Sequence, residues 1–248
     1  GDLVISALDR KLLRDLRRIW AQSLAIALVM ACGVAMLIIS FGTLQNLTQT
    51  RDAYYERNRF AEIFASATRV PYDLVSEIAA IDGVAQAEAR IVDYVVLDMP
   101  EMVEPGMGRI VSLPEDGEPV LNVPLLRLGQ LPDPTSVDEV AVSEPFANAH
   151  GLRPGDSFRA ILNGQARDLL VSGIALSPEY IYTIGPATLL PDDRRFGIFW
   201  MSHQSAASGF DLEGAFNDLT LKLTPGADPA PVIAAIDELL DPYGGTGA

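Results

Sequence analysis

The hydrophobic positions of this chain fall into one long apolar stretch followed by many short alternating segments. The stretch covers residues 19–44, and its central part, residues 24–39, has no polar interruption. A helix rises 1.5 Å per residue, so the stretch would extend roughly 39 Å, more than the ~30 Å hydrocarbon layer of a bilayer. A cleaved signal peptide or a lipoprotein signal fits less well, because their apolar regions are shorter. The pattern therefore predicts a permanent transmembrane helix at 19–44.

The segment before this stretch, residues 1–18, is predicted to be a basic amphipathic helix. Its apolar residues recur at helical spacing, with arginines mostly between them. Such a helix can lie in the headgroup region, where Trp20 would act as an aromatic anchor. A solvated cytoplasmic tail is the alternative interpretation.

The segment after it, residues 45–60, contains no glycine or proline and is predicted to continue as a helical stalk. Leu47 and Tyr54 fall on one face of this helix, and we expect them to transmit motion from the membrane. A flexible linker is the alternative interpretation.

Residues 61–248 are predicted to form one mixed α/β domain that begins with a β-α-β unit. Glu62–Val70 alternates as a strand does, and Pro71 is expected to open a helix at Tyr72–Ile81. The run Ala85–Leu97 is rich in Val, Ile and Tyr and is predicted to be a single strand.

The far end of the domain repeats this order. Asn217–Leu223 is predicted to be a strand and Pro229–Leu240 a helix. The two predicted helices share the pentapeptide Ile-Ala-Ala-Ile-Asp, at residues 78–82 and 233–237. These parallels predict two similar halves of one split α/β sheet, with the shared Ile and Ala residues on the buried helix faces.

The middle of the domain is predicted to be rich in strands. Asn163-Gly164 is the clearest local signal, because this pair suits the two φ > 0 positions of a type I′ hairpin turn. The turn would connect Ser157–Leu162 to Gln165–Ile174. The Pro- and Leu-rich segment Gly117–Asp133 is expected to be an ordered loop. Further predictions here are strands at Arg109–Leu113 and Glu139–Ser143 and a helix at Pro145–His150.

One loop concentrates aromatic residues and prolines. Its residues Pro178, Glu179, Tyr180 and Tyr182 are candidates for contact with a partner, because exposed aromatic patches mark binding surfaces. The competing interpretation is that Tyr180 and Tyr182, together with Phe199 and Trp200, close the core of the domain.

The distribution of charge predicts the orientation in the membrane. Residues 1–18 hold five basic and three acidic residues, a net charge of +2, whereas the remaining 13 basic and 30 acidic residues give −17. Basic segments stay on the cytoplasmic side, so the N-terminus is expected inside and the main domain in the periplasm, on the outer side of a bacterial inner membrane. The absence of a basic stripe argues against a nucleic-acid partner.

Candidate chemistry is sparse. The sequence has no nucleophile elbow, no HExxH and no phosphate-binding glycine loop, so no catalytic or cofactor-binding residue is predicted. His150 and His203 stand alone, and Cys32, the single cysteine, falls within the predicted span. We therefore predict neither a metal site nor an intrachain disulfide, and no enzyme activity. The fold class predicted is α+β: a transmembrane helix followed by an extracytoplasmic domain with split β-α-β units and a β-rich middle lobe.

The order of several motifs resembles the beginning of an FtsX/MacB-type ABC transporter permease. After the basic stub, the span and the stalk come Val142-Ser143-Glu144, Gly151-Leu152-Arg153-Pro154-Gly155-Asp156, Asn163-Gly164 and Val171-Ser172-Gly173-Ile174. This series is similar to the MacB-type periplasmic core domain. The segments Ser177–Tyr182 and Pro191–Gly197 resemble a subgroup of long export permeases.

This resemblance implies a function in transport. Such permeases work with a separate cytoplasmic ATPase that binds the ATP, so no cofactor is expected in this chain itself. The resemblance also implies a homodimer or a paired permease, a periplasmic adaptor protein and contact with membrane lipid. Because no second apolar run follows, the chain is expected to be an N-terminal fragment of a longer permease. The alternative is a single-span membrane-anchored receptor or regulator whose external domain binds a partner protein.

Overall fold

A computed structural model of the chain describes Trp20, Gln22, residues 24–36, 60–99, Met102, 104–180, Gly185 and 191–245. The chain divides into two units, residues 1–53 and 54–248. In the first unit, residues 24–36 form an exposed helix. Within the described residues, no helix reaches the length and hydropathy needed to cross a membrane. The predicted span is described only in part, and the stub and stalk lie almost wholly outside the described residues, so all three stay predictions.

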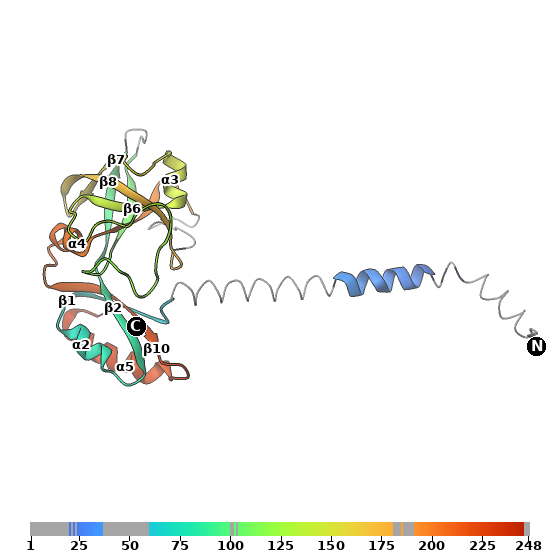
Figure 1. Ribbon diagram of the computed structural model, residues 1–248. Coiled ribbons are helices and arrows are strands. Elements are labelled where there is room, and N and C mark those ends of the chain that lie inside the picture. Colours follow the sequence, from blue (N-terminus) through green and yellow to red (C-terminus); the bar gives the residue numbers. More distant parts are fainter. Residues whose placement is uncertain are drawn as a thin grey trace, which may run out of the picture. The chain divides into compact units, whose positions relative to one another are not determined.

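The second unit contains two sheets, and the smaller one has three strands covered by two helices (Figure 1). Its elements are β1 (Ile63–Pro71), α2 (Leu74–Ala79), β2 (Val84–Arg90), β10 (Ala215–Leu223), α5 (Pro229–Leu240) and the short 3-10 helix η1 (Asp241–Tyr243). The strands lie in the order β1-β10-β2, and both pairings are antiparallel. β1 and β2 therefore run parallel to each other, with α2 connecting them. This confirms the predicted split β-α-β arrangement; we call it the small-sheet lobe.

The small sheet packs one of its faces against α2 and α5. On one face, Ile63 and Leu219 pack against Ile78 of α2 and Ile236 of α5. Several of the alternate positions carry polar side chains, among them Arg90 at the end of β2. Since successive strand residues point to opposite faces, these polar groups lie away from the helices.

Two predictions for this lobe are corrected. Pro71 does not open a helix; it is the last residue of β1 and pairs with Ala215. Proline is tolerated there because β1 is an edge strand, which needs no donor on its free side. The helix starts later, at Leu74. The two shared pentapeptides also bury different positions. In α2 the buried residue is the first isoleucine, Ile78, whereas in α5 it is the second isoleucine, Ile236. Three of their alanines are exposed.

The larger sheet closes on itself. Its elements are β3 (Val92–Asp98), β4 (Gly106–Ser112), β5 (Leu125–Gly129), β6 (Glu139–Ser143), α3 (Glu144–His150), β7 (Ser157–Leu162), β8 (Gln165–Leu176), β9 (Phe196–Met201) and α4 (His203–Phe210). The seven strands are ordered β5-β8-β6-β9-β4-β3-β7, and β7 pairs in addition with β8. This pairing closes β8, β6, β9, β4, β3 and β7 into a ring, with β5 outside it. We call this part the barrel lobe.

The barrel interior is filled by aromatic side chains for which glycines make room. The ring of Phe199 lies 5.2 Å from that of Phe146 and 5.3 Å from that of Phe158. Gly108 and Gly197 face each other in the β4–β9 pairing. A Cβ at Gly108 would lie 2.5 Å from Phe199, and one at Gly197 would lie 2.7 Å from Phe146. Both positions therefore require glycine because an aromatic ring occupies the space.

The middle of the chain confirms the hairpin and corrects one loop. Asn163 and Gly164 both have positive φ, 46° and 80°, as a type I′ turn demands, and β7 and β8 flank them. The segment Gly117–Asp133 was expected to be loop throughout, but it contains β5. That strand was missed because it lies mostly exposed at the edge of the sheet. Its leucines therefore do not alternate with polar residues as those of a half-buried strand do.

The predicted single strand Ala85–Leu97 is in fact two strands in two sheets. β2 ends at Arg90 and β3 begins at Val92, and Ile91 between them is fully buried. A continuous run of β-forming residues cannot show where a chain leaves one sheet for another, because both strands have the same local preference.

Candidate functional site

The junction between the two lobes holds several buried polar residues of the second unit. Here the chain crosses from β2 to β3, and hydrogen bonds hold the crossing on both sides. The backbone N–H of Ile91 donates to Ser112 Oγ at 2.9 Å, and the backbone N–H of Ser112 donates to the Ile91 carbonyl at 2.8 Å. The side chain of Asn217 accepts from the N–H of Val92 at 2.8 Å and donates to its carbonyl at 2.9 Å. The crossing is therefore hydrogen-bonded both to β4 and to β10.

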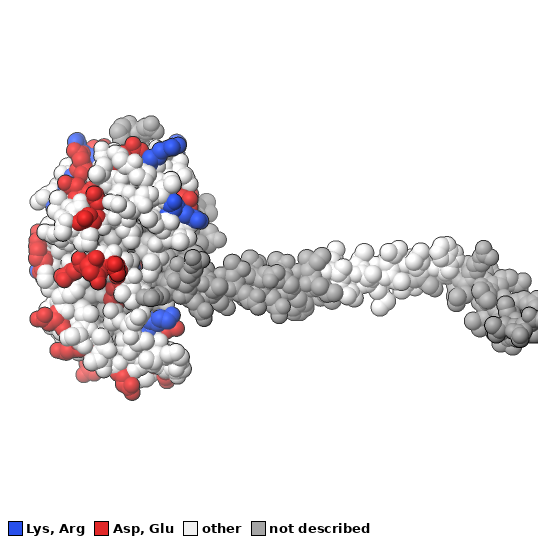
Figure 2. Space-filling model, in the orientation of Figure 1, with Lys and Arg blue, Asp and Glu red and all other residues white. Residues whose placement is uncertain are grey.

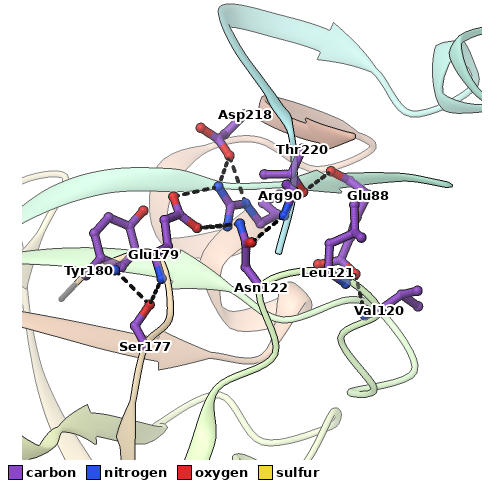
Figure 3. Close-up of polar contacts among 11 residues, drawn as sticks. Glu88, Arg90, Val120, Leu121, Asn122, Ser177, Glu179, Tyr180, Asp218 and Thr220 are labelled. Atoms are coloured by element: carbon purple, nitrogen blue, oxygen red, sulfur yellow. Dashed lines mark hydrogen bonds and ion pairs between the residues drawn. The ribbon is translucent and has the colours of Figure 1, made fainter. Parts of the chain in front are cut away.

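Arg90 lies at the centre of this junction, between two carboxylates (Figure 3). Its Nε and Nη2 donate to Asp218 Oδ1 at 2.8 and 2.6 Å. Its Nη1 and Nη2 donate to the two oxygens of Glu179 at 2.7 and 3.2 Å. Asp218 is the register partner of Arg90 on β10, whereas Glu179 follows β8 in the barrel lobe. The arginine thus binds one carboxylate from each lobe.

These three side chains are almost removed from solvent. The exposed fraction is 5% for Arg90, 14% for Glu179 and 11% for Asp218. Charges buried to this degree are costly unless paired and hydrogen-bonded, and a guanidinium provides the planar fork that two carboxylates require. The geometry meets that condition, which indicates that the junction is built around Arg90.

A second set of contacts ties the loop between β4 and β5 to the small-sheet lobe. Asn122 donates to Glu179 Oε2 at 2.8 Å and accepts from the N–H of Ala61 at 2.9 Å. Glu88 accepts from the N–H groups of Val120 and Leu121 at 2.6 and 3.1 Å. Ala61 precedes β1, so these contacts reach the point where the chain enters the small-sheet lobe.

The electrostatics of the junction follow from one cation between two carboxylates. Burial alone would raise the pKa of Glu179, but the Arg90 charge and its hydrogen bonds hold that pKa below its usual value. Burial raises the pKa of Asp218 even though Arg90 is beside it. Burial would lower the pKa of Arg90, yet Asp218 and Glu179 raise it well above the usual value. Arg90 is therefore charged at any physiological pH, and Glu179 is its more firmly ionised partner.

The segment that carries Glu179 is held by its own short turn. Ser177 Oγ accepts from the N–H groups of Glu179 and Tyr180, both at 3.0 Å. Arg109 lies over the rings of both Tyr180 and Tyr94, at 5.3 and 5.5 Å from their centroids. This stacking places a second cation beside the Arg90 network, and burial followed by the charge of Glu179 raises the pKa of Tyr180.

The structure places only some of the residues that the sequence analysis proposed. Pro178 is buried and Glu179 belongs to the Arg90 network. Tyr180 packs against a second cluster of barrel-strand side chains, which includes Trp200 and is separate from the one around Phe199. Phe199 and Trp200 are buried, as the core interpretation expects. Tyr182, Leu47 and Tyr54 lie outside the described residues. Contact of the 178–182 loop with a partner stays a prediction, as does transmission through Leu47 and Tyr54.

Sequence reasoning missed Arg90, Asp218 and Asn122. A usable signal existed for the first two, because each is a charged residue inside a strand whose other positions are mainly apolar. A charge at such a position calls for a buried partner. Asn122 gave no signal, since asparagine is common in loops.

The ion pairs of Arg90 link the two lobes directly. Arg90 is bound by carboxylates on both sides, and no group of three or more His, Cys, Asp or Glu residues that could hold a metal ion occurs among the described residues. Acidic side chains are spread over the face of the second unit that Figure 2 shows, and basic ones are few.

Comparison with known proteins gave one family and several solved structures. The family model of the MacB-like periplasmic core domain matches residues 23–239. The extracellular domain of the noncanonical ABC-type transporter YknZ from Gram-positive bacteria is 11% identical, with a TM-score of 0.47, over 73% of this chain and 90% of that one. The periplasmic region of MacB from Actinobacillus actinomycetemcomitans is 10% identical, with a TM-score of 0.44, over 71% and 77%. A domain of a permease protein from Porphyromonas gingivalis is 14% identical, with a TM-score of 0.39, over 72% and 78%. No sequence among curated proteins matched.

Proposed function

This chain belongs to the MacB-like periplasmic core domain family, and on that basis we propose that it is part of the permease subunit of an ABC transporter. The observation that carries the proposal is the family match over residues 23–239, which includes most of both lobes. In this proposal residues 1–18 are cytoplasmic, residues 19–44 cross the bacterial inner membrane, and the second unit lies in the periplasm. The proposed function is transport rather than catalysis.

The proposed mechanism passes motion from the membrane into the second unit. A separate cytoplasmic ATPase would bind and hydrolyse ATP and move the membrane helices. The proposed stalk, residues 45–60, leads directly to Ala61 and β1. From β1 the hydrogen-bonded path runs through β10 to β2 and then through Arg90 to Glu179 in the barrel lobe. The Arg90 network supports this mechanism because it couples the two lobes by direct ion pairs.

The partners in this proposal follow from the family. They are the ATPase, a second permease chain in a homodimer or a paired permease, a periplasmic adaptor protein and membrane lipid. The transported substrate would be taken from the envelope and exported or extracted. A free-standing membrane-anchored receptor is not favoured, because no observation on the described residues points to it.

Copurification tests the proposed function. The full-length protein, solubilised from its native membrane in a mild detergent, is expected to bring with it a subunit that hydrolyses ATP, detected by mass spectrometry and by nucleotide turnover. An unrelated single-span membrane protein with the same tag is the control. If no nucleotide-hydrolysing subunit accompanies the protein in the absence or presence of ATP, the transporter proposal fails.

A further inference from the structure

β2 is an edge strand of the small sheet, and a cleft lies along its free edge. The strand order β1-β10-β2 gives β2 a neighbouring strand on one side only. The cleft has a volume of about 380 Å³, and Ala87, Glu88 and Ala89 of the strand are among the residues that line it. Ligand sites have volumes of about 300–1,000 Å³. The proposed function does not use this edge.

The hydrogen bonds of β2 show which of its backbone groups face the free edge. The hydroxyl of Thr220 on β10 donates to the carbonyl of Glu88 at 3.3 Å, so this carbonyl points toward β10 (Figure 3). Carbonyls alternate in direction along a strand, so that of Ala89 points to the free edge, where the Tyr72 hydroxyl donates to it at 3.3 Å. By the same alternation both backbone groups of Ala87 and the N–H of Ala89 face the free edge. Outside the β2–β10 pairing, no hydrogen bond among the described residues involves these three groups.

The two walls of the cleft differ in character. Tyr72 and Val75 line it on the side of α2, where both also pack against the core of the small-sheet lobe. The loop after β4 forms the other wall, and Glu88 ties that loop to the strand by accepting from the N–H groups of Val120 and Leu121. An extended segment added to β2 would turn alternate side chains toward these two walls. The cleft therefore fits a segment in which apolar and polar residues alternate.

The loop wall is acidic. Glu115, Asp116 and Glu118 line the cleft with exposed side chains, and no lysine or arginine is among its described lining residues. No ion pair between described residues involves any of these three carboxylates. Negative charge also reaches the strand edge, because burial, followed by the charges of Glu115 and Glu88, raises the pKa of Tyr72 to about 12. An acidic wall beside unpaired backbone groups favours a basic segment.

We propose that the free edge of β2 binds an extended basic segment of a partner protein, which adds to the small sheet as a further strand. The backbone of the segment pairs with Ala87 and with the N–H of Ala89. Its apolar side chains contact Val75, and its lysines or arginines face Glu115 and Glu118. In strand addition, main-chain pairing supplies affinity and the alternate side chains supply specificity. This proposal does not depend on the chain being part of a transporter.

Labelled pentapeptides test the proposal on the full chain in an uncharged detergent. The probe is Lys-Val-Lys-Val-Lys, and fluorescence anisotropy measures its Kd. It is expected to bind at least about tenfold more tightly than Lys-Lys-Lys-Val-Val, which has the same composition without the alternation. It should also slow hydrogen exchange at the N–H of Ala87, followed by NMR. Equal binding of the two peptides, or unchanged exchange at Ala87, overturns the proposal.

Methylation of the peptide backbone separates strand pairing from attraction between charges. One version of the alternating peptide carries N-methyl groups on both valines, and another carries one on the central lysine. Only alternate residues of a strand pair with a given neighbour. One version should therefore bind at least about tenfold more weakly, while the other keeps its Kd. Equal Kd values for the methylated and unmethylated peptides would show general attraction to an acidic protein and refute strand addition.

Variants of the protein test the two parts of the cleft separately. Ala87→Pro removes an N–H group on the free side of an edge strand, where proline is tolerated, and is expected to raise the Kd at least about tenfold. Glu115→Gln with Glu118→Gln leaves the strand untouched and is expected to raise the Kd about fivefold. Glu238→Gln with Asp98→Asn removes the same charge from exposed positions on α5 and β3 and should leave the Kd unchanged. Equal weakening by both pairs of substitutions counts against the site.

A second copy of this chain is the competing occupant of the edge. Analytical ultracentrifugation of the unmodified chain and of Ala87→Pro, both without peptide, distinguishes the two occupants. The proposal predicts the same oligomeric state for both proteins. A dimer that Ala87→Pro abolishes would assign the edge to a second copy and exclude the basic segment.

Discussion

Arg90→Ala is expected to lower the free energy of unfolding by about 3–5 kcal/mol, because it leaves two buried carboxylates without their cation. The variant loses four hydrogen bonds from the guanidinium to Asp218 and Glu179. Denaturant unfolding of the chain in detergent, followed through the fluorescence of buried Trp200 in a Trp20→Phe background, measures the loss. A loss that is no larger than that of a surface substitution would contradict a joint built around Arg90.

An exposed pair of the same chemistry provides the control for this experiment. Arg159 and Asp168 are 2.9 Å apart on the barrel surface, with more than half of each side chain exposed. Arg159→Ala is expected to leave the unfolding midpoint almost unchanged, because exposed ion pairs contribute little.

The pH dependence of the same variant gives an independent check. Without Arg90, burial raises the folded-state pKa values of Asp218 and Glu179 above their unfolded values. A group with a raised folded pKa destabilises the fold once pH exceeds that of the unfolded group, and the penalty is relieved as pH falls. In the unmodified chain Arg90 instead holds the pKa of Glu179 low. The stability deficit of Arg90→Ala should therefore be larger at about pH 7 than at about pH 5.

Phe199→Ala is expected to lower the free energy of unfolding by about 3–5 kcal/mol, because it opens a cavity in the centre of the barrel lobe. The Phe199 ring is fully buried and contacts the rings of Phe146 and Phe158. The same unfolding experiment measures the effect. Leu128→Ala, at an exposed position of β5, is the matched control and should have a much smaller effect.

The glycine opposite this ring tests whether the packing is specific. Gly108→Ala should destabilise the chain by about 1–3 kcal/mol, since its new Cβ would overlap Phe199. In a Phe199→Leu background the cost should fall, because the ring that it meets is gone. Strictly additive effects would show that Gly108 is not required by the ring.

Elements with a local signature could be predicted from the sequence. The Asn163-Gly164 turn was recognised because its two positive φ angles depend only on those residues. The helix Pro229–Leu240 was placed correctly, because a proline opens it and Pro242 and Gly244 follow its end. The split sheet followed from matching strand–helix order at the two ends of the chain.

Features set by distant contacts could not be predicted in the same way. The division at Ile91 depends on hydrogen bonds from Ile91 to Ser112 and from Val92 to Asn217. Both acceptors are remote from the division in the sequence. The loop residue Glu179 was noticed for its aromatic neighbours, but its role comes from Arg90, 89 positions earlier. Closure of the barrel also needs the β3–β7 and β4–β9 pairings, which join strands far apart in the sequence and which no local pattern specifies.

The distance between the two lobes tests the central claim most directly. In a Cys32→Ser background, spin labels at Glu238 in α5 and Gln165 at the barrel hairpin, both exposed positions, report the separation of the lobes by electron paramagnetic resonance. If the Arg90 network holds the lobes as one body, the unmodified chain should give a single narrow distance distribution, and Glu179→Gln a broader one. A broad distribution in the unmodified chain, equal to that of the variant, would contradict the account.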